Sequence, residues 1–97
     1  MCTLALYFQT LQTYPLLVAA NRDELYDRPS AAPSLRDGHP KMIAGQDLRA
    51  GGTWLGVNEF GLMAGILNRR INGAALPPSV ARSRGLLCMQ LLQVKTL

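Results

Sequence analysis

The stretch that decides the fold is residues 53–67, TWLGVNEFGLMAGIL. Two apolar runs, residues 53–57 and 62–67, flank the connecting residues 58–61, NEFG. A connection of four residues that ends in glycine between two such runs predicts a β-hairpin. Residues 42–45 form another short apolar run before it. The centre of the chain therefore predicts antiparallel strands.

Toward the N-terminus, residues 3–8 and 16–20 are apolar runs bounded by polar or turn-forming residues. We expect them to pair as antiparallel strands. Residues 25–41 contain three prolines and a glycine and show little periodicity, which predicts a long surface loop. Loops of this length are more often functional than idle.

Toward the C-terminus, residues 68–78 are predicted to form a second loop, because the two prolines at its end exclude a helix there. A helix is expected from Ser83 onward, with Ser83 as its N-cap. Its spacing predicts one buried stripe, formed by Leu87, Leu91 and Val94. Strands followed by a helix predict an α+β fold.

Length and composition limit the class of protein. The chain has 97 residues, of which 48% are hydrophobic and 16% charged, and this supports one domain at most. Its apolar runs are shorter than the roughly 18 residues of a membrane span. The N-terminus lacks the positive region of a secretory signal, and two cysteines are too few for a disulfide scaffold. We therefore expect no transmembrane segment and a cytoplasmic location.

The end of the sequence interrupts an amphipathic pattern without a glycine or proline stop signal. Residues 1–97 are therefore expected to be a single, incomplete domain. The net charge of +4 is concentrated in residues 60–97, which carry five cations and no acidic residue. These cations are not interleaved with aromatic residues and accompany no nucleic-acid motif, so no nucleic-acid partner is expected.

Cys2 is the first candidate catalytic residue. Removal of Met1 is expected because a small residue follows it, and it would leave Cys2 with a free α-amine beside its thiol. An α-amine has an ordinary pKa of about 7.7 to 8.0, so it can take the thiol proton near neutral pH without a distant histidine. The thiolate can then attack a carbonyl. The alternative is that Cys2 is a small apolar residue that opens a strand.

Arg22 and Asp23 lie in the polar segment NRDE, residues 21–24, directly after an apolar run. Antiparallel pairing of that run with residues 3–8 would return the segment close to Cys2. Arg22 can then stabilise a thiolate or hold a carboxylate or carbonyl group. Asp23 can accept hydrogen bonds from the α-ammonium or orient Arg22. The alternative is a surface ion pair at a strand end.

These residues belong to a set of motifs that resembles the NRDE family of transport and Golgi organisation proteins. The motifs are, in order, MCT at 1–3, NRDE at 21–24, YDRP at 26–29, AG at 44–45, DLRAGGTWLGV at 47–57 and NR at 68–69. They run across nearly the whole chain. The chain resembles the N-terminal portion of a family whose members are considerably longer.

The resemblance implies an N-terminal nucleophile (Ntn) hydrolase fold, a four-layer αββα sandwich, of which this chain holds a part. It also implies a relation to the cysteine Ntn enzymes that cleave penicillin V and conjugated bile salts, and hence hydrolysis of a linear amide C–N bond. Cys2 would be nucleophile and base, flanked by Arg22 and Asp23. In those acylases intervening residues separate the arginine and the aspartate. Here the two are adjacent, so only one is expected to reach the sulfur.

Further candidates lie in the second half of the chain. Asn68 follows a predicted strand, where its amide or backbone N–H can contribute to an oxyanion hole, and capping a turn is the alternative. Trp54 is expected either to floor a substrate pocket or to lie in the core. Arg49 is expected to be a solvated cation, with anion binding beside the following glycines as the alternative. Cys88 is expected to be buried.

The second hypothesis is a protein without catalysis. The family resemblance implies handling or trafficking of haem or lipid by a carrier that keeps the fold but not the reaction. His39, the only histidine, is then a candidate haem or metal ligand, although no partner accompanies it. No other cofactor is expected. The expected partner is a small-molecule amide or a haem or lipid ligand, and the oligomeric state is left open.

Overall fold

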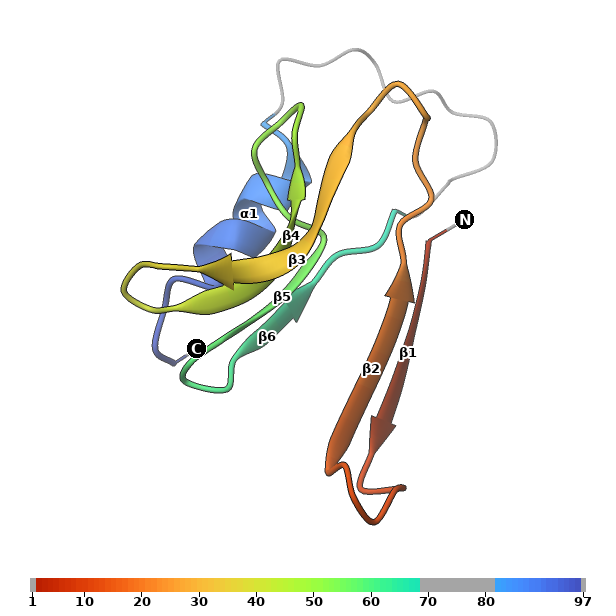
Figure 1. The fold of residues 1–97 in the computed structure, drawn as a ribbon, viewed down its shortest axis with the longest axis vertical. Coiled ribbons are helices and arrows are strands. Elements are labelled where there is room, and N and C mark those ends of the chain that lie inside the picture. The colour runs from red at the N-terminus through yellow and green to blue at the C-terminus, as the bar shows by residue number, and fades with distance from the viewer. Residues whose placement is uncertain (1, 69–81, 97) are drawn as a thin grey trace.

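A computed structural model describes residues 2–68 and 82–96. Within these residues the chain forms two antiparallel sheets and one helix, so the predicted α+β class is confirmed. Figure 1 shows a two-stranded sheet beside a four-stranded sheet of order β3-β4-β5-β6. The elements are β1 (Thr3–Phe8), β2 (Leu16–Asn21), β3 (Ser30–Arg36), β4 (Met42–Asp47), β5 (Leu55–Asn58), β6 (Met63–Gly65) and α1 (Arg84–Leu91).

The antiparallel pair expected near the N-terminus is confirmed. Strands β1 and β2 pair in register from Thr3 opposite Asn21 to Phe8 opposite Leu16. At the open end, the Thr3 N–H donates to Asn21 Oδ1 at 2.6 Å, which holds the two strand ends together. Figure 1 shows this hairpin reaching away from the larger sheet. It therefore places Cys2 and the segment after β2 at the end where the two sheets approach each other.

The central hairpin is also confirmed, as strands β5 and β6 pair antiparallel through the predicted connection. Gly61 adopts a φ of +81°, a conformation that other residues rarely tolerate. The Asn58 N–H donates to the Leu62 carbonyl at 2.9 Å and closes the turn. Both strands are shorter than expected at the ends far from the turn. Thr53 lies outside β5 because its N–H donates to the carbonyl of Gly85 instead of to a neighbouring strand.

The prediction of an uninterrupted loop over residues 25–41 is wrong, because strand β3 lies within it. Strand β3 is at the edge of the sheet and pairs only with β4. An edge strand tolerates proline, since one side of its backbone makes no ladder hydrogen bonds. The register shifts between Ala31 and Ser34, so Pro33 sits at the irregularity. The prolines thus indicated an edge strand with a bulge rather than the absence of a strand.

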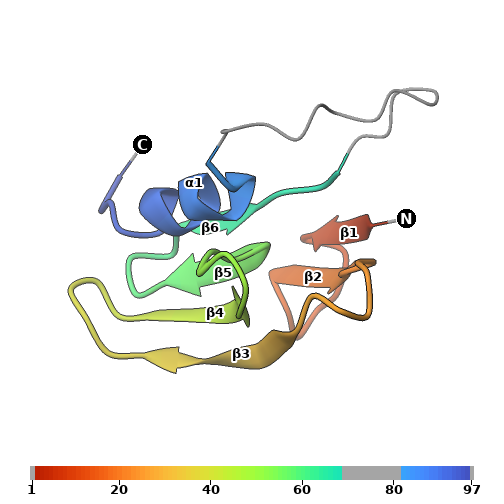
Figure 2. The same ribbon diagram turned by 90° about the horizontal axis from the view of Figure 1, so that it is seen from above.

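Helix α1 packs against β5 and β6, as Figure 2 shows from above. The helix begins where expected, but Ser83 makes no side-chain capping hydrogen bond. The predicted stripe of Leu87, Leu91 and Val94 is wrong, because these three side chains are exposed. Cys88 and Leu92 are fully buried instead. The buried face is therefore displaced by one residue, while the expected burial of Cys88 is confirmed.

The position of Leu92 explains this displacement. Gly56 of β5 has no side chain, and a Cβ built there would lie 2.5 Å from Leu92 Cδ1. Leu92 thus packs directly on the strand and forms a small core with Met42 and Ala44 of β4. The buried Asn58 side chain secures this end of the helix by donating to the carbonyls of Leu92 and Val94 at 3.1 and 2.8 Å.

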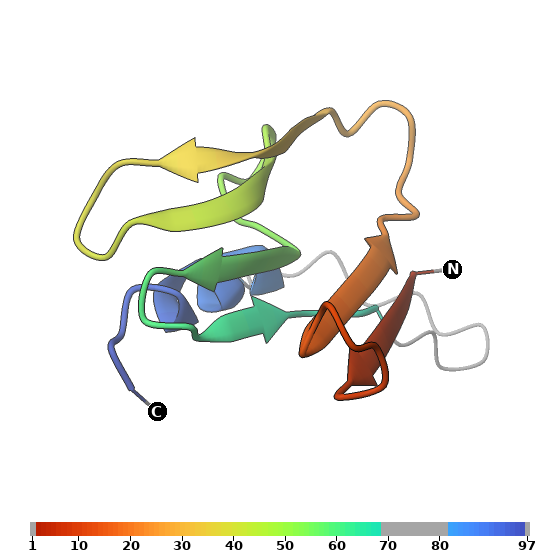
Figure 3. The same cartoon turned by 60° about the horizontal axis from the view of Figure 1, so that its bottom comes forward.

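The loop expected at residues 68–78 lies outside the described residues, apart from Asn68. Met1, whose removal the sequence predicts, also lies outside them. Figure 3 shows the two sheets from below, with α1 behind the β5–β6 hairpin. Of the residues described, no helix is long and apolar enough to cross a membrane.

Candidate functional site

One cavity brings all four candidate catalytic residues together. It is open to solvent and has a volume of about 80 Å³. Its walls come from the start of the chain, the segment after β2, the residues before β5, the end of the β6 segment and the start of α1. The lining residues are Cys2, Arg22, Asp23, Glu24, Arg28, Asp47, Thr53, Trp54, Ile66, Asn68, Ser83, Arg84 and Gly85.

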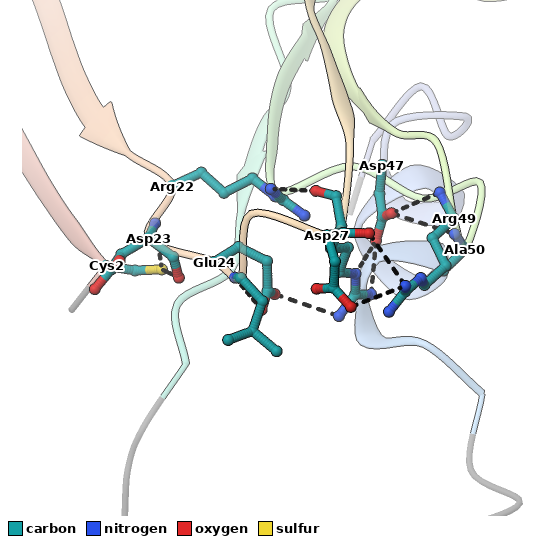
Figure 4. A network of polar contacts seen from close by, with 10 residues as sticks. Cys2, Arg22, Asp23, Glu24, Asp27, Asp47, Arg49 and Ala50 are labelled. Carbon is teal, nitrogen blue, oxygen red and sulfur yellow. Dashed lines mark hydrogen bonds and ion pairs between the residues drawn. The ribbon is translucent and has the colours of Figure 1, made fainter.

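Cys2 is a free, half-buried thiol on the cavity wall. Its Sγ donates to the Asp23 carbonyl at 3.6 Å and accepts from the Asp23 N–H at 3.4 Å. The register explains this contact. Asn21 at the end of β2 lies opposite Thr3, so the two residues that follow β2 lie near Cys2. Figure 4 shows the sulfur lying against the Asp23 backbone. The sulfur is thus fixed in position without being sealed from solvent.

The Arg22 side chain extends away from the sulfur, as Figure 4 shows. Its Nη1 donates to the Arg28 carbonyl at 3.4 Å. Its guanidinium carbon lies 5.2 Å from the centroid of the Trp54 ring, within the range of a cation–π contact. Of the two adjacent residues, Asp23 therefore touches the sulfur through its backbone, and Arg22 occupies another part of the cavity wall.

Trp54 lines the cavity. Of the two placements expected from the sequence, a pocket wall or the core, the structure thus shows the first. Its ring packs on the buried Gly45 of β4, where a Cβ would come within 2.5 Å of two ring carbons. Glycine at this position therefore lets the indole ring pack directly against the sheet. Gly45, Trp54 and Arg22 form a stack that reaches from the sheet to the cavity.

A partly buried ion pair on the cavity wall was not predicted as part of the site. Arg28 donates to Asp47 Oδ2 from Nε at 3.0 Å and from Nη2 at 2.6 Å. Its Nη1 donates to Glu24 Oε2 at 3.3 Å. Arg28 and Asp47 both lie within the motifs that carry the family resemblance, and this was the available signal. Their pairing links the segment after β2 to β4 and so joins the two sheets.

Burial and hydrogen bonding shift the pKa of Asp47 in opposite directions. This residue is only 6% exposed. Burial raises the pKa of the Asp47 carboxyl, but hydrogen bonds from Arg28 and from the backbone N–H groups of Ala50 and Arg49 outweigh it, and the pKa is lowered. The hydrogen bond to Asp47 in turn raises the pKa of Arg28. Both groups are therefore charged at neutral pH.

The start of α1 reaches the cavity through a close approach of two glycines. Gly52 is buried against the backbone of Gly85, and a side chain on Gly52 would overlap that backbone. The Thr53 N–H donates to the Gly85 carbonyl at 3.1 Å. This contact brings Ser83 and Arg84 to the cavity. The preceding residue, Gly51, has a φ of +76°, which glycine adopts without strain.

The remaining candidates have different surroundings. Asn68 is exposed and lines the cavity beyond β6. Arg49 is held by Asp27, donating from Nη2 to its carbonyl at 3.1 Å and to its carboxylate at 3.4 Å. His39 lies in a second, open hollow with Met42 and Met89. Within the described residues, no cluster of three or more histidine, cysteine or acidic side chains is arranged to hold a metal ion.

Fold and site together define a class, an α+β protein with a half-buried cysteine at a polar cavity between two antiparallel sheets. Comparison with known families is more specific. The model of the family Transport and Golgi organisation 2 matches residues 1–97, and the chain belongs to this family. The NRDE resemblance described above refers to the same family and is confirmed.

Mammalian relatives support the assignment. The Transport and Golgi organization protein 2 homolog of Bos taurus is 38% identical over 85 residues, which cover 81% of this chain and 29% of the relative. The homologs of Mus musculus and Homo sapiens are each 40% identical over 58 residues, covering 57% of this chain and 21% of the relative. The chain thus matches less than a third of their length. No solved structure matches it significantly.

Proposed function

We propose that this chain is the nucleophile-bearing part of an Ntn-type hydrolase that cleaves a linear amide C–N bond through Cys2. The observation that carries the proposal is the half-buried Cys2 sulfur, held by the Asp23 backbone at 3.4 and 3.6 Å on the wall of a polar cavity. The proposal treats residues 1–97 as one portion of a larger Ntn domain, because the relatives extend far beyond the matched region.

The reaction follows from the position of Cys2 once Met1 is removed. The α-amine takes the thiol proton, and Sγ attacks the amide carbon to give a tetrahedral oxyanion. The C–N bond breaks as the α-ammonium returns the proton to the leaving nitrogen, which leaves a thioester on Cys2. Water then attacks the thioester carbon, releases the carboxylic acid and restores the thiol. The cycle needs no redox partner.

The other site residues have supporting roles in this proposal. The Asp23 N–H, which donates to the sulfur, stabilises negative charge on it. Asn68 supplies a hydrogen-bond donor near the oxyanion, and Arg22 binds the substrate across the cavity from the nucleophile. A reducing compartment keeps an unpaired thiol such as Cys2 reduced, and we propose the cytoplasm as the place of the reaction.

The first prediction tests Cys2 directly. Intact mass should show the chain without Met1, and p-nitrophenyl acetate should acylate Cys2 in preference to Cys88. The reason is that Cys88 is buried, and burial raises the pKa of its thiol. Peptide mapping locates the adduct, and Cys2→Ala serves as the matched control. Retention of Met1, or equal acylation of both cysteines, would contradict the mechanism.

One observation favours the alternative, a haem carrier. An open hollow of about 660 Å³ is lined in part by His39, Met42, Met89 and Arg36. An imidazole group ligates haem iron, and a guanidinium can pair with a propionate, so His39 and Arg36 are the side chains that would hold haem here. When bound, haem would supply an iron centre that the imidazole of His39 would ligate.

A haem titration separates the two functions. A carrier that uses this hollow should keep its Soret absorbance in Cys2→Ala and lose it in His39→Ala, since His39 lies in the hollow and Cys2 does not. Soret absorbance that is unchanged in His39→Ala would contradict haem binding in this hollow.

A further inference from the structure

We infer that the substrate group bound in the cavity beside Cys2 carries a carboxylate, and that Arg22 holds it. This inference rests on the proposed function only in taking the cavity as the place where substrate binds. It adds that the substrate carries a negative charge, a property that cannot be inferred from Cys2 alone.

The distribution of ion pairs is the first step. Within the described parts of the chain, the ion pairs are those of Arg28 with Glu24 and Asp47 and that of Arg49 with Asp27. Arg28 therefore neutralises two acidic groups of the cavity. Arg22 and Arg84 also line the cavity, and neither forms an ion pair with any carboxylate that the structure describes.

The second step is the set of donors on Arg22. A guanidinium has five N–H donors in a planar fork and cannot lose its charge in a protein. Within the described residues, one hydrogen bond from Arg22 is present, from Nη1 to the Arg28 carbonyl at 3.4 Å. The Trp54 ring lies 5.2 Å from the guanidinium and limits its rotation. Among the described residues, the other donors of Arg22 have no hydrogen-bond partner, and we infer that they bind the ligand.

The third step is size. Pockets that enclose whole drug-sized ligands measure about 300 to 1,000 Å³, whereas this cavity measures about 80 Å³. The part of the cavity that residues 1–97 form has room for a small group such as a compact anion. A carboxylate meets this requirement, and its two oxygens match the spacing of the guanidinium fork. Arg84, which is exposed at the cavity, adds a second positive charge.

Alkylation of Cys2 tests this inference without any turnover. N-iodoacetylglycine and its amide react at the same carbon with the same leaving group. They differ only at the far end, where one carries a carboxylate that extends across the cavity and the other carries a neutral carboxamide. We define the ratio as the second-order rate constant of the carboxylate reagent at Cys2 divided by that of the amide reagent. Measured by peptide mass spectrometry, this ratio reports how strongly the site attracts the carboxylate. We expect this ratio to be higher in the folded chain than in urea. We also expect Arg22→Gln to lower it by about threefold to tenfold.

Matched variants make the test specific. Arg22→Lys keeps the charge but loses the fork, so an intermediate ratio is expected. Arg49→Gln removes a cation that is not a lining residue of the cavity and should leave the ratio unchanged. Circular dichroism of each variant verifies that the chain is folded. An Arg22→Gln ratio equal to that of the unsubstituted chain, or an equal fall in Arg49→Gln, would overturn the inference.

Failure of the inference can be told apart from failure of the proposed function. Alkylation requires only a thiol, so the charge preference is measurable whether or not Met1 is removed. A charge preference without acylation of Cys2 would contradict the hydrolase and keep the carboxylate site. Acylation of Cys2 without a charge preference would contradict the carboxylate site and keep the hydrolase.

Discussion

The carboxylate of Asp47 is bound by a guanidinium on one side and by two backbone N–H groups on the other. Arg28 contacts Oδ2, while the N–H groups of Arg49 and Ala50 donate to Oδ1 at 3.0 and 3.2 Å. Because these bonds lower the pKa of Asp47 in the folded chain, folding favours its ionised form. Its contribution to stability is therefore present above the unfolded pKa of about 3.9 and is lost as the pH falls through the lower folded pKa.

The second prediction follows from this linkage. Asp47→Asn should lower the free energy of unfolding at pH 7 by about 2 to 3 kcal/mol, because it leaves Arg28 without its main partner. The difference from the unsubstituted chain should shrink below about pH 4. Urea denaturation at several pH values measures both effects. Asp27→Asn is the control, since that side chain is 69% exposed and its ion pair should contribute less than about 1 kcal/mol.

Gly45 and Trp54 provide the third prediction. Gly45→Ala should displace the indole and cost about 1 to 3 kcal/mol, because the new methyl group would overlap the ring. Trp54 is the only tryptophan, so its fluorescence reports the displacement without interference. Gly38→Ala is the matched control, as a Cβ there would meet its nearest atom at an ordinary 3.5 Å. Equal spectra for the two variants would contradict the stack described above.

At the scale of elements, the face of α1 that binds the sheet yields the fourth prediction. Leu92→Ala should lower the free energy of unfolding by about 2 to 4 kcal/mol, since Leu92 is 0% exposed and fills the space over Gly56. Leu87→Ala should cost less than about 1 kcal/mol, because Leu87 is 55% exposed. Chemical denaturation of both variants compares the two faces. A larger loss in Leu87→Ala would restore the stripe predicted from the sequence.

Elements held by local pairing could be predicted from the sequence, and those that depend on distant contacts could not. Strands β1 and β2 and the β5–β6 hairpin follow from apolar runs separated by short turns. The buried face of α1 depends on which strand residue lacks a side chain, and Gly56 is far away in the sequence. Strand β3 was missed because its prolines are compatible with a strand only at a sheet edge, and edge positions do not appear in a local pattern.

The same distinction applies to the candidate site. Contacts that follow from local strand pairing could be predicted, and contacts that depend on distant packing could not. The approach of Asp23 to Cys2 follows from antiparallel pairing, which the sequence already predicted. The direction of Arg22 depends on Trp54 and on the Arg28 carbonyl, so it requires the packed structure. Ser83 and Arg84 reach the cavity only through the contact between Gly52 and Gly85. No spacing rule relates these two glycines, and the lining role of α1 therefore could not be predicted.

For the whole molecule, the important feature is the apolar surface of the β1–β2 hairpin. Large side chains on both strands are 40–62% exposed, namely Leu6, Tyr7, Phe8, Leu16 and Leu17. Apolar surfaces of this kind promote association, and both strands of a two-stranded sheet present open edges.

The fifth prediction is that the 97-residue chain associates as its concentration rises. Sedimentation velocity should show a rising average mass, and Phe8→Glu should reduce it because a charge opposes burial of the hairpin surface. Val94→Glu, a change at an exposed site away from the hairpin, is the control. A constant monomer mass at all concentrations would show that the hairpin surface is tolerated in water.

The contact between Gly52 and Gly85 has a consequence for the order of events on the ribosome. Cys2 emerges early, whereas the part of the wall that comes from the start of α1, Ser83 to Gly85, emerges much later. Enzymes that trim the first residue of a nascent chain therefore meet an open N-terminus. In the proposed mechanism, removal of Met1 and completion of the cavity wall are therefore separated in time.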